Sequence, residues 1–257
     1  MRKSLTCLCL AVVSAVVPAA AQEAPRGNLA RVTYWTVADA DAFEAGVQAH
    51  NQFHASLGDA VPIHTFEVVT GPRVGQYIRA SFGHTWADFD AEMANLEGDA
   101  ADSAKNLDPH VTGSVPAIYE ALPEISRFSQ GGIRPLAKII EFQLKWGHER
   151  AFMDAIGKIH AALSETEGFR PYLWYRLEDG GHVPTYVVSL PSDDWAGFAR
   201  PERGIDEIVG EKYGEEAGAI FEAMGSAIKS ESSYTIAYRS DLSYLPAVPA
   251  EAAEAAE

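Results

Sequence analysis

Three histidines offer the clearest candidate chemistry in the sequence: His50, His54 and His64. His50 and His54 are one helical turn apart, so both rings point the same way if the segment is a helix. We expect this helix to pack on a sheet whose second strand carries His64. Three imidazoles at one helix–sheet interface are a number that zinc or iron accepts as ligands.

Three interpretations of these histidines stay open. In the first, they line a pocket for a small, mostly apolar molecule. In the second, they bind a metal ion or haem, although the segment from His50 to His54 lacks the intervening glutamate of a zinc hydrolase motif. In the third, they are structural and bond to backbone or water, because a buried polar group costs about 1–3 kcal/mol unless it is satisfied.

We favour the pocket, with Trp35 nearby on the core face of the first strand. The predicted ligand-binding residues are Trp35, His50, Asn51, His54, His64 and Phe66. The sequence identifies no catalytic residue, and we predict no metal ligand and no cofactor. Whether the protein is an enzyme stays open at this stage.

An internal repeat determines the expected architecture. Residues 43–89 match residues 152–198 at a constant offset of 109, and residues 29–32 match residues 136–139 at an offset of 107. A further match pairs residues 117–121 with residues 219–223. Insertions that fall only where loops are expected indicate a true duplication.

The two copies differ at the three histidines. At the matched positions the second copy has Ile159, Leu163 and Leu173. These aliphatic residues suit a helix–sheet interface, so their histidine counterparts should line the same interface. The first copy is therefore expected to keep a pocket at this interface. In the second copy, aliphatic side chains are expected to fill the same space.

Each copy has the hydrophobic periodicity of a strand, a helix, a β-hairpin and a second helical region. The expected helices begin near Phe43 and Phe152, and the second helical regions begin at Trp86 and Trp195, two tryptophans that we expect to be core anchors. Residues 95–125 are expected to form several short helices. The expected strands are 32–37, 63–69 and 74–81 in the first copy and 139–144, 172–177, 183–190 and 234–239 in the second.

This order is β-α-β-β-α-β, the ferredoxin-like arrangement, occurring twice. With this pattern over residues 29–240, the chain resembles the dimeric α+β barrel superfamily, and within it NIPSNAP-like and antibiotic-biosynthesis-monooxygenase-like domains. The resemblance implies an α+β fold of two fused ferredoxin-like units packed sheet to sheet, and a ligand cavity between helix and sheet. Haem-using members such as chlorite dismutases need an axial histidine in the C-terminal half, for which His160 is the positional candidate.

The space between the two sheets is a second candidate site. If Trp35 faces the helices, alternation along the first strand of each copy turns Tyr34, Thr36, Glu141 and Gln143 inward. We expect the next two strands to add Glu67, Tyr77, Arg79, Trp174, Arg176 and Tyr186. The charged members of this group are expected to pair with one another at the interface.

The N-terminus predicts export. Met1, Arg2 and Lys3 precede a short apolar run, and Ala19-Ala20-Ala21 is typical of a cleavage site, so residues 1–21 are interpreted as a signal peptide. Both cysteines, Cys7 and Cys9, would be removed with it. Export without a disulfide favours a periplasmic or secreted location.

The remaining chain is assigned to a first repeat at 22–131, a second repeat at 132–245 and a disordered tail at 246–257. A net charge of −16 and the lack of a Lys/Arg cluster exclude nucleic acid as an expected partner, and no segment is apolar enough for membrane insertion. The oligomeric state is left open. We predict binding or cofactor-independent oxidative conversion of a small apolar molecule, with a non-catalytic envelope interaction protein as the alternative.

Overall fold

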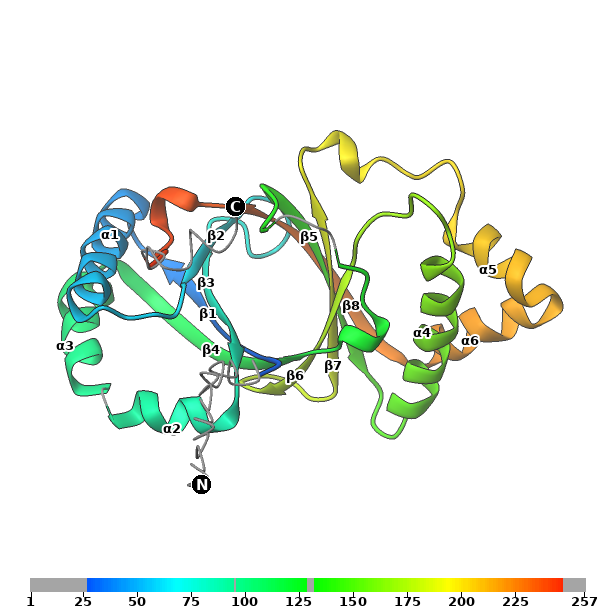
Figure 1. Ribbon diagram of the computed structural model, residues 1–257, viewed down its shortest axis with the longest axis horizontal. Helices are drawn as coiled ribbons and strands as arrows, with labels where there is room; N and C mark the ends of the chain where they lie inside the picture. Colours follow the sequence, from blue (N-terminus) through cyan, green and yellow to red (C-terminus); the bar gives the residue numbers. More distant parts are fainter. Residues whose placement is uncertain (1–26, 95, 129–131, 247–257) are drawn as a thin grey trace, which may run out of the picture.

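The computed structural model describes residues 27–94, 96–128 and 132–246, which form an eight-stranded β-barrel with helices packed on its outside (Figure 1). The predicted signal peptide and residues 247–257 of the predicted tail lie outside the described residues. Within the described ranges, no helix combines the length and the apolar character that crossing a membrane requires.

The barrel is closed and antiparallel throughout. Its strands are β1 (Leu29–Val37), β2 (His64–Val68), β3 (Tyr77–His84), β4 (Val111–Ala121), β5 (Leu136–Leu144), β6 (Leu173–Asp179), β7 (Thr185–Ser192) and β8 (Ile228–Tyr238). The spatial order β4-β1-β3-β2 in the first half reappears as β8-β5-β7-β6 in the second. Pairing of β2 with β8 and of β4 with β6 joins the halves.

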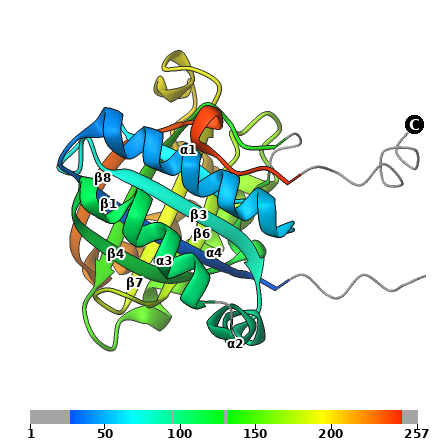
Figure 2. The ribbon, with the colours of Figure 1, turned by 90° about the vertical axis from the view of Figure 1, so that its left-hand side faces the viewer.

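The helices cover two opposite sides of the barrel. They are α1 (Ala40–Leu57), α2 (Trp86–Ala94), α3 (Leu96–Asn106), α4 (Glu149–Ser164), α5 (Ile205–Tyr213) and α6 (Ala217–Ala227). α1 and α3 lie on one side, and α4, α5 and α6 lie on the other (Figure 1). Turned by 90°, the molecule shows α1 and α3 side by side over the strands of the first half (Figure 2).

The predicted β-α-β-β-α-β order of elements is confirmed in both halves. The expectation of several short helices over residues 95–125 is wrong, because this stretch contains α3 and the long strand β4. Gly113 and Pro116 obscure β4 in the sequence, since glycine and proline are depleted in strands. The match of residues 117–121 with 219–223 is also wrong, because it pairs β4 with α6. That the halves are two copies of one unit stays a prediction.

Two hydrophobic clusters hold the second half and the barrel together. The larger packs α4, α5 and α6 on the outer face of the sheet around Phe152, and the other lines the barrel interior with residues from all eight strands. The first half has only a small helix–sheet cluster around Phe43. Trp86 and Trp195 belong to none of these clusters and are both 56% exposed, so their prediction as core anchors is wrong.

An ion pair fixes α1 to the end of the barrel. Arg239, just after β8, donates to both carboxylate oxygens of Glu44 at 2.6 and 2.8 Å, and the Tyr77 hydroxyl donates to the same carboxylate. The hydrogen bonds from Arg239 hold the pKa of Glu44 below its ordinary value. The position of α1 on the sheet therefore depends partly on an ionised Glu44.

A pH dependence follows from this lowered pKa. Because the folded state favours the ionised carboxylate, the pair stabilises the protein above the unfolded pKa of Glu44, and this contribution is lost as pH falls through the folded pKa. We expect Glu44→Gln to lower the free energy of unfolding by about 1 kcal/mol or less at pH 7 and by almost nothing near pH 3. Urea unfolding of both proteins at the two pH values measures this difference, and an equal difference at both would contradict it.

Candidate metal and ligand site

Helix α1 brings the two predicted histidines together. Asp39 caps its N-terminus by accepting from the backbone N–H of Ala42, and Gly58 ends it with a φ of 70°, in the left-handed region that favours glycine. His50 is buried at 5% exposure, one turn before His54. Their Nε2 atoms lie 3.1 Å apart.

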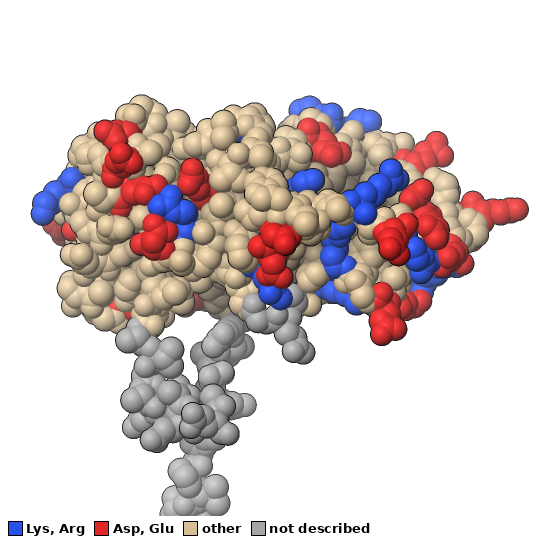
Figure 3. Space-filling model, turned by 90° about the horizontal axis from the view of Figure 1, so that it is seen from above, with Lys and Arg blue, Asp and Glu red and all other residues tan. Residues whose placement is uncertain are grey.

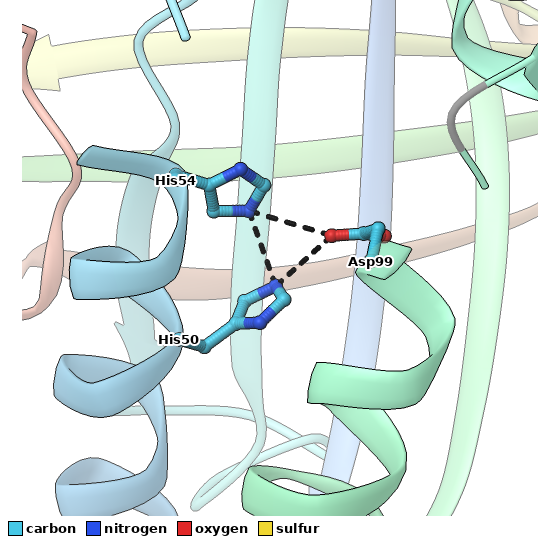
Figure 4. Close-up of side chains that lie close together, drawn as sticks. All are labelled: His50, His54 and Asp99. Carbon is cyan, nitrogen blue, oxygen red and sulfur yellow. Dashed lines mark hydrogen bonds and ion pairs between the residues drawn. The ribbon is translucent and has the colours of Figure 1, made fainter. Parts of the chain in front are cut away.

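Helix α3 adds a carboxylate to this pair. Asp99 Oδ1 lies 3.4 Å from Nε2 of His50 and 3.6 Å from Nε2 of His54, and all three side chains point to one spot between the helices (Figure 4). The close approach needs Gly46 on α1, because a Cβ there would lie 1.9 Å from the carbonyl oxygen of Asn106 at the end of α3. These ligand atoms lie within 4.8 Å of one another and could hold a metal ion.

Two further carboxylates orient the rings. Asp102 Oδ1 lies 2.8 Å from Nδ1 of His50, and Asp59 Oδ2 lies 2.6 Å from Nδ1 of His54. Burial lowers the pKa of His50, and the hydrogen bond with Asp102 opposes this effect. A carboxylate on the far nitrogen is the usual way in which proteins fix the tautomer and the direction of a metal-binding histidine.

The cluster borders a cavity of about 960 Å³ between α1, α3 and the outer face of β1 and β3. Its apolar wall includes Phe53, Leu57, Val61, Ile63 and Leu107. Trp35 and Arg79 line the same cavity from the sheet. The predicted helix–sheet pocket is therefore present as a cavity next to Trp35, His50 and His54.

Arg79 is a buried cation in the wall of this cavity. It is 7% exposed, and one guanidinium nitrogen donates to the side-chain oxygen of Asn51 at 2.5 Å. Burial lowers the pKa of Arg79 to about 10, an effect that the charge of Asp99 partly offsets. Asn51 is held in turn by the bond from its amide nitrogen to the carbonyl oxygen of Leu242. Asn51 thus contributes to the site by positioning Arg79.

His64 and Phe66 are not part of this cavity, so their predicted place beside His50 and His54 is wrong. Both line a separate cavity of about 350 Å³ in the barrel interior. The ring of His64 lies near Phe82 and Tyr238, and burial lowers the pKa of His64. On β2 it is Thr65 that faces outward, since its hydroxyl donates to the carbonyl oxygen of Leu242.

Of the residues predicted to face the barrel interior, Tyr34 on β1 and Glu141 on β5 do so. There, Arg73 pairs with Glu141 at 3.0 Å and lies over the Tyr34 ring. The strand-two and strand-three residues predicted to join them face outward instead, toward helices or solvent: Glu67, Tyr77, Arg79, Trp174, Arg176 and Tyr186. The predicted pairing among these charges is wrong, since Arg176 pairs with Glu120 and Glu178.

The matching interface of the second half is packed with hydrocarbon. Ile159 and Leu163 are 7% and 4% exposed within the cluster around Phe152. His160, the positional candidate for a haem ligand, has its Nδ1 2.9 Å from the Tyr172 hydroxyl. On the face of the molecule seen in Figure 3, basic side chains are interspersed with acidic ones.

Sequence reasoning missed Asp99, Asp102, Asp59 and Arg79 as members of this site. Asp99 and Asp102 lie outside the matched range 43–89, and Asp59 lies inside it, at the position matched by Gly168 of the second copy. One signal was present for Arg79, because its counterpart at the offset of 109 is Val188, again an aliphatic residue of the second half.

No protein-family model matches the sequence, and no curated protein is similar enough to count as a match. Solved structures do match. An anthrone oxidase-like protein is 14% identical with a TM-score of 0.55, covering 88% of this chain and 98% of its own. A proposed monooxygenase from Lactobacillus acidophilus is 11% identical with a TM-score of 0.52, covering 82% of this chain and 93% of its own.

A mutant chlorite dismutase from Candidatus Nitrospira defluvii is 10% identical with a TM-score of 0.49, covering 83% of this chain and 92% of its own. Similarity at this level of identity concerns the fold and leaves the activity open. The chain therefore has the ferredoxin-like α+β fold that it shares with monooxygenase-like proteins.

Proposed function

We propose that the protein binds a small, mostly apolar molecule bearing an acceptor oxygen in the cavity between α1, α3 and the sheet, and converts it oxidatively. One observation carries this proposal. Among the described residues, three buried side-chain atoms have no hydrogen-bond partner: Trp35 Nε1, Arg79 Nε and Asp99 Oδ1. All three belong to residues that line this one cavity.

Buried polar atoms without partners are rare and cost about 1–3 kcal/mol each. Trp35 Nε1 and Arg79 Nε are both donors, so together they suit an oxygen that carries negative charge, such as a carboxylate or the enolate of an aromatic ketone. The apolar wall around Phe53 and Leu57 suits the hydrocarbon part of the same molecule. At neutral pH, Arg79 stays protonated because its pKa of about 10 is well above 7.

Oxidative conversion is supported by the structural neighbours, which are described as monooxygenase and anthrone oxidase-like proteins. An enolate is the electron-rich form that dioxygen attacks, and buried donors aimed at its oxygen stabilise that charge. For anthrone, the balanced reaction consumes one dioxygen and gives anthraquinone and water. The protein would contribute binding, charge stabilisation and exclusion of bulk water.

Two variants test the role of the donors, each carrying the residue that the second half has at the matched position: Trp35→Phe and Arg79→Val. The probe is anthrone, with binding followed by calorimetry under nitrogen and oxidation followed by dioxygen uptake. Hydrogen bonds involving charged groups contribute about 1.5–3 kcal/mol, so we expect Arg79→Val to weaken binding about 10- to 100-fold. Trp35→Phe should weaken it less, because its bond is formed by a neutral donor.

His64→Leu is the matched control, because His64 lies in the barrel interior and not in this cavity. Its binding and dioxygen uptake should equal those of the wild type. Unchanged anthrone binding in both donor variants, with intact folding by circular dichroism, would refute the cavity as the binding site.

We also propose that the protein is exported to the periplasm or medium, and that its halves descend from one duplicated NIPSNAP-like unit. The first proposal is supported by the charged and apolar N-terminal segment, and the intact mass of exported protein, starting near Gln22, tests it. The second is supported by the repeat at the offset of 109 and by the equal strand order of the halves.

A further inference from the structure

We infer that His50, His54 and Asp99 are the ligands of a divalent transition-metal ion of the zinc or iron(II) class. The inference goes beyond the proposed function and does not rest on it, because it depends on the arrangement of the ring nitrogens and not on the organic ligand. The site lies on the wall of the same cavity, between α1 and α3 (Figure 4).

The hydrogen-bonding pattern leaves three lone pairs converging on one point. Both Nδ1 atoms face carboxylates, Asp102 and Asp59, which accept hydrogen bonds and cannot donate them when ionised. Each Nδ1 therefore carries the proton, and in a neutral imidazole the Nε2 atom is then an acceptor. The two Nε2 atoms face each other at 3.1 Å, and Asp99 Oδ1 faces both.

Three acceptors so close repel one another unless a positive charge lies between them. Metal–ligand bonds of about 2.1 Å at angles between about 90° and 110° place ligand atoms about 3.0–3.4 Å apart. The observed separations of 3.1, 3.4 and 3.6 Å agree with this range to within a few tenths of an ångström. Only small side-chain adjustments would give each ligand a normal bond length.

Two imidazoles and one carboxylate are ligands that zinc and iron(II) both accept, and three protein ligands leave coordination positions open. Asp102 and Asp59 would act as positioning residues, because they hold the protons on Nδ1 and direct Nε2 to the metal. His64 lies on the inner face of the barrel and is not a ligand. Asp99 from α3 is the third protein ligand. An open position would face the cavity that Trp35 and Arg79 also line.

Calorimetric titration of zinc chloride into chelator-treated protein, without any organic molecule, tests the inference. The wild type should bind one zinc ion. Asp99→Ala should lose this affinity, and it should fold normally because the Asp99 side chain is 40% exposed. Asp102→Asn should weaken binding about 10- to 100-fold, as expected for a residue that orients a ligand.

His64→Leu should bind zinc like the wild type and serves as the control. Cobalt(II) in place of zinc gives a second readout, since its visible absorption distinguishes four-coordinate from six-coordinate metal. The inference is overturned if the wild type binds no zinc or cobalt, or if folded Asp99→Ala binds both as tightly as the wild type. Either result would leave anthrone binding by metal-free protein unaffected, so failure here is distinguishable from failure of the proposed function.

Discussion

The double variant His50→Ile/His54→Leu is expected to lose zinc binding while keeping the fold. It gives α1 the residues of α4 at the matched positions, Ile159 and Leu163, which pack well in the second half. Removal of two of three ligands should lower zinc affinity by more than about 1000-fold, equivalent to about 4 kcal/mol. The free energy of unfolding of the metal-free protein should change by about 1 kcal/mol or less, because buried polar rings are exchanged for hydrocarbon that such an interface tolerates.

Thermal melts with and without EDTA measure both effects. A ligand that binds only the folded state raises the melting temperature, so EDTA should lower it in the zinc-loaded wild type and leave the double variant unchanged. His64→Leu should respond to EDTA as the wild type does. If the double variant melts far below metal-free wild type, the histidines are structural, and the hydrogen bonds to Asp102 and Asp59 would be their main role.

Phe152→Ala is expected to destabilise the protein by about 3–5 kcal/mol. Phe152 is fully buried and contacts Phe142, Trp174 and Tyr186 in the densely packed cluster of the second half. Densely packed neighbours relax little when the ring is removed, so a cavity remains. This cavity makes the decrease in the free energy of unfolding larger.

Phe43→Ala is the matched comparison, since Phe43 is also fully buried and occupies the equivalent position on α1. It packs against Trp35 and Tyr77, and Trp35 also lines the 960 Å³ cavity, which gives this neighbour room to move. Phe43→Ala should therefore lower the free energy of unfolding by less than Phe152→Ala does. Urea unfolding measures both values. Equal losses would mean that the two helix–sheet interfaces are packed alike.

The sequence was sufficient to predict the order of elements except for β4, which was missed, and it did not predict the face of every strand. The helix carrying His50 and His54 was clear, because its apolar residues recur at helical spacing. On β2 and β3 the alternation of side chains does not show which face is inside, because the barrel interior and the helix interface are both apolar. Phe66 and Tyr77 suit either side. A register error of one residue moves a whole strand to the other face, which is why Arg79 and His64 were misplaced.

Asp99 could not be predicted as a partner of the histidines from the sequence. It is 45 or more positions away from both, in a segment where Gly98 suggests a break rather than a helix. Only the packing of α3 on α1, through Gly46, brings its carboxylate to the Nε2 atoms. A third ligand on another element depends on tertiary contact, which local periodicity does not encode.

Closure of the barrel has a consequence for self-association. An open four-stranded sheet exposes backbone donors and acceptors along its outermost strands, and such edges recruit strands from other molecules. Here β2 and β6, which would be outermost in isolated halves, pair with β8 and β4 instead. Within the part of the chain that the structure describes, the ring leaves no such strand unpaired. A polypeptide of one half alone would expose two such edges, β4 and β2 in the first half or β8 and β6 in the second. Its simplest remedy would be to pair with a second copy of itself.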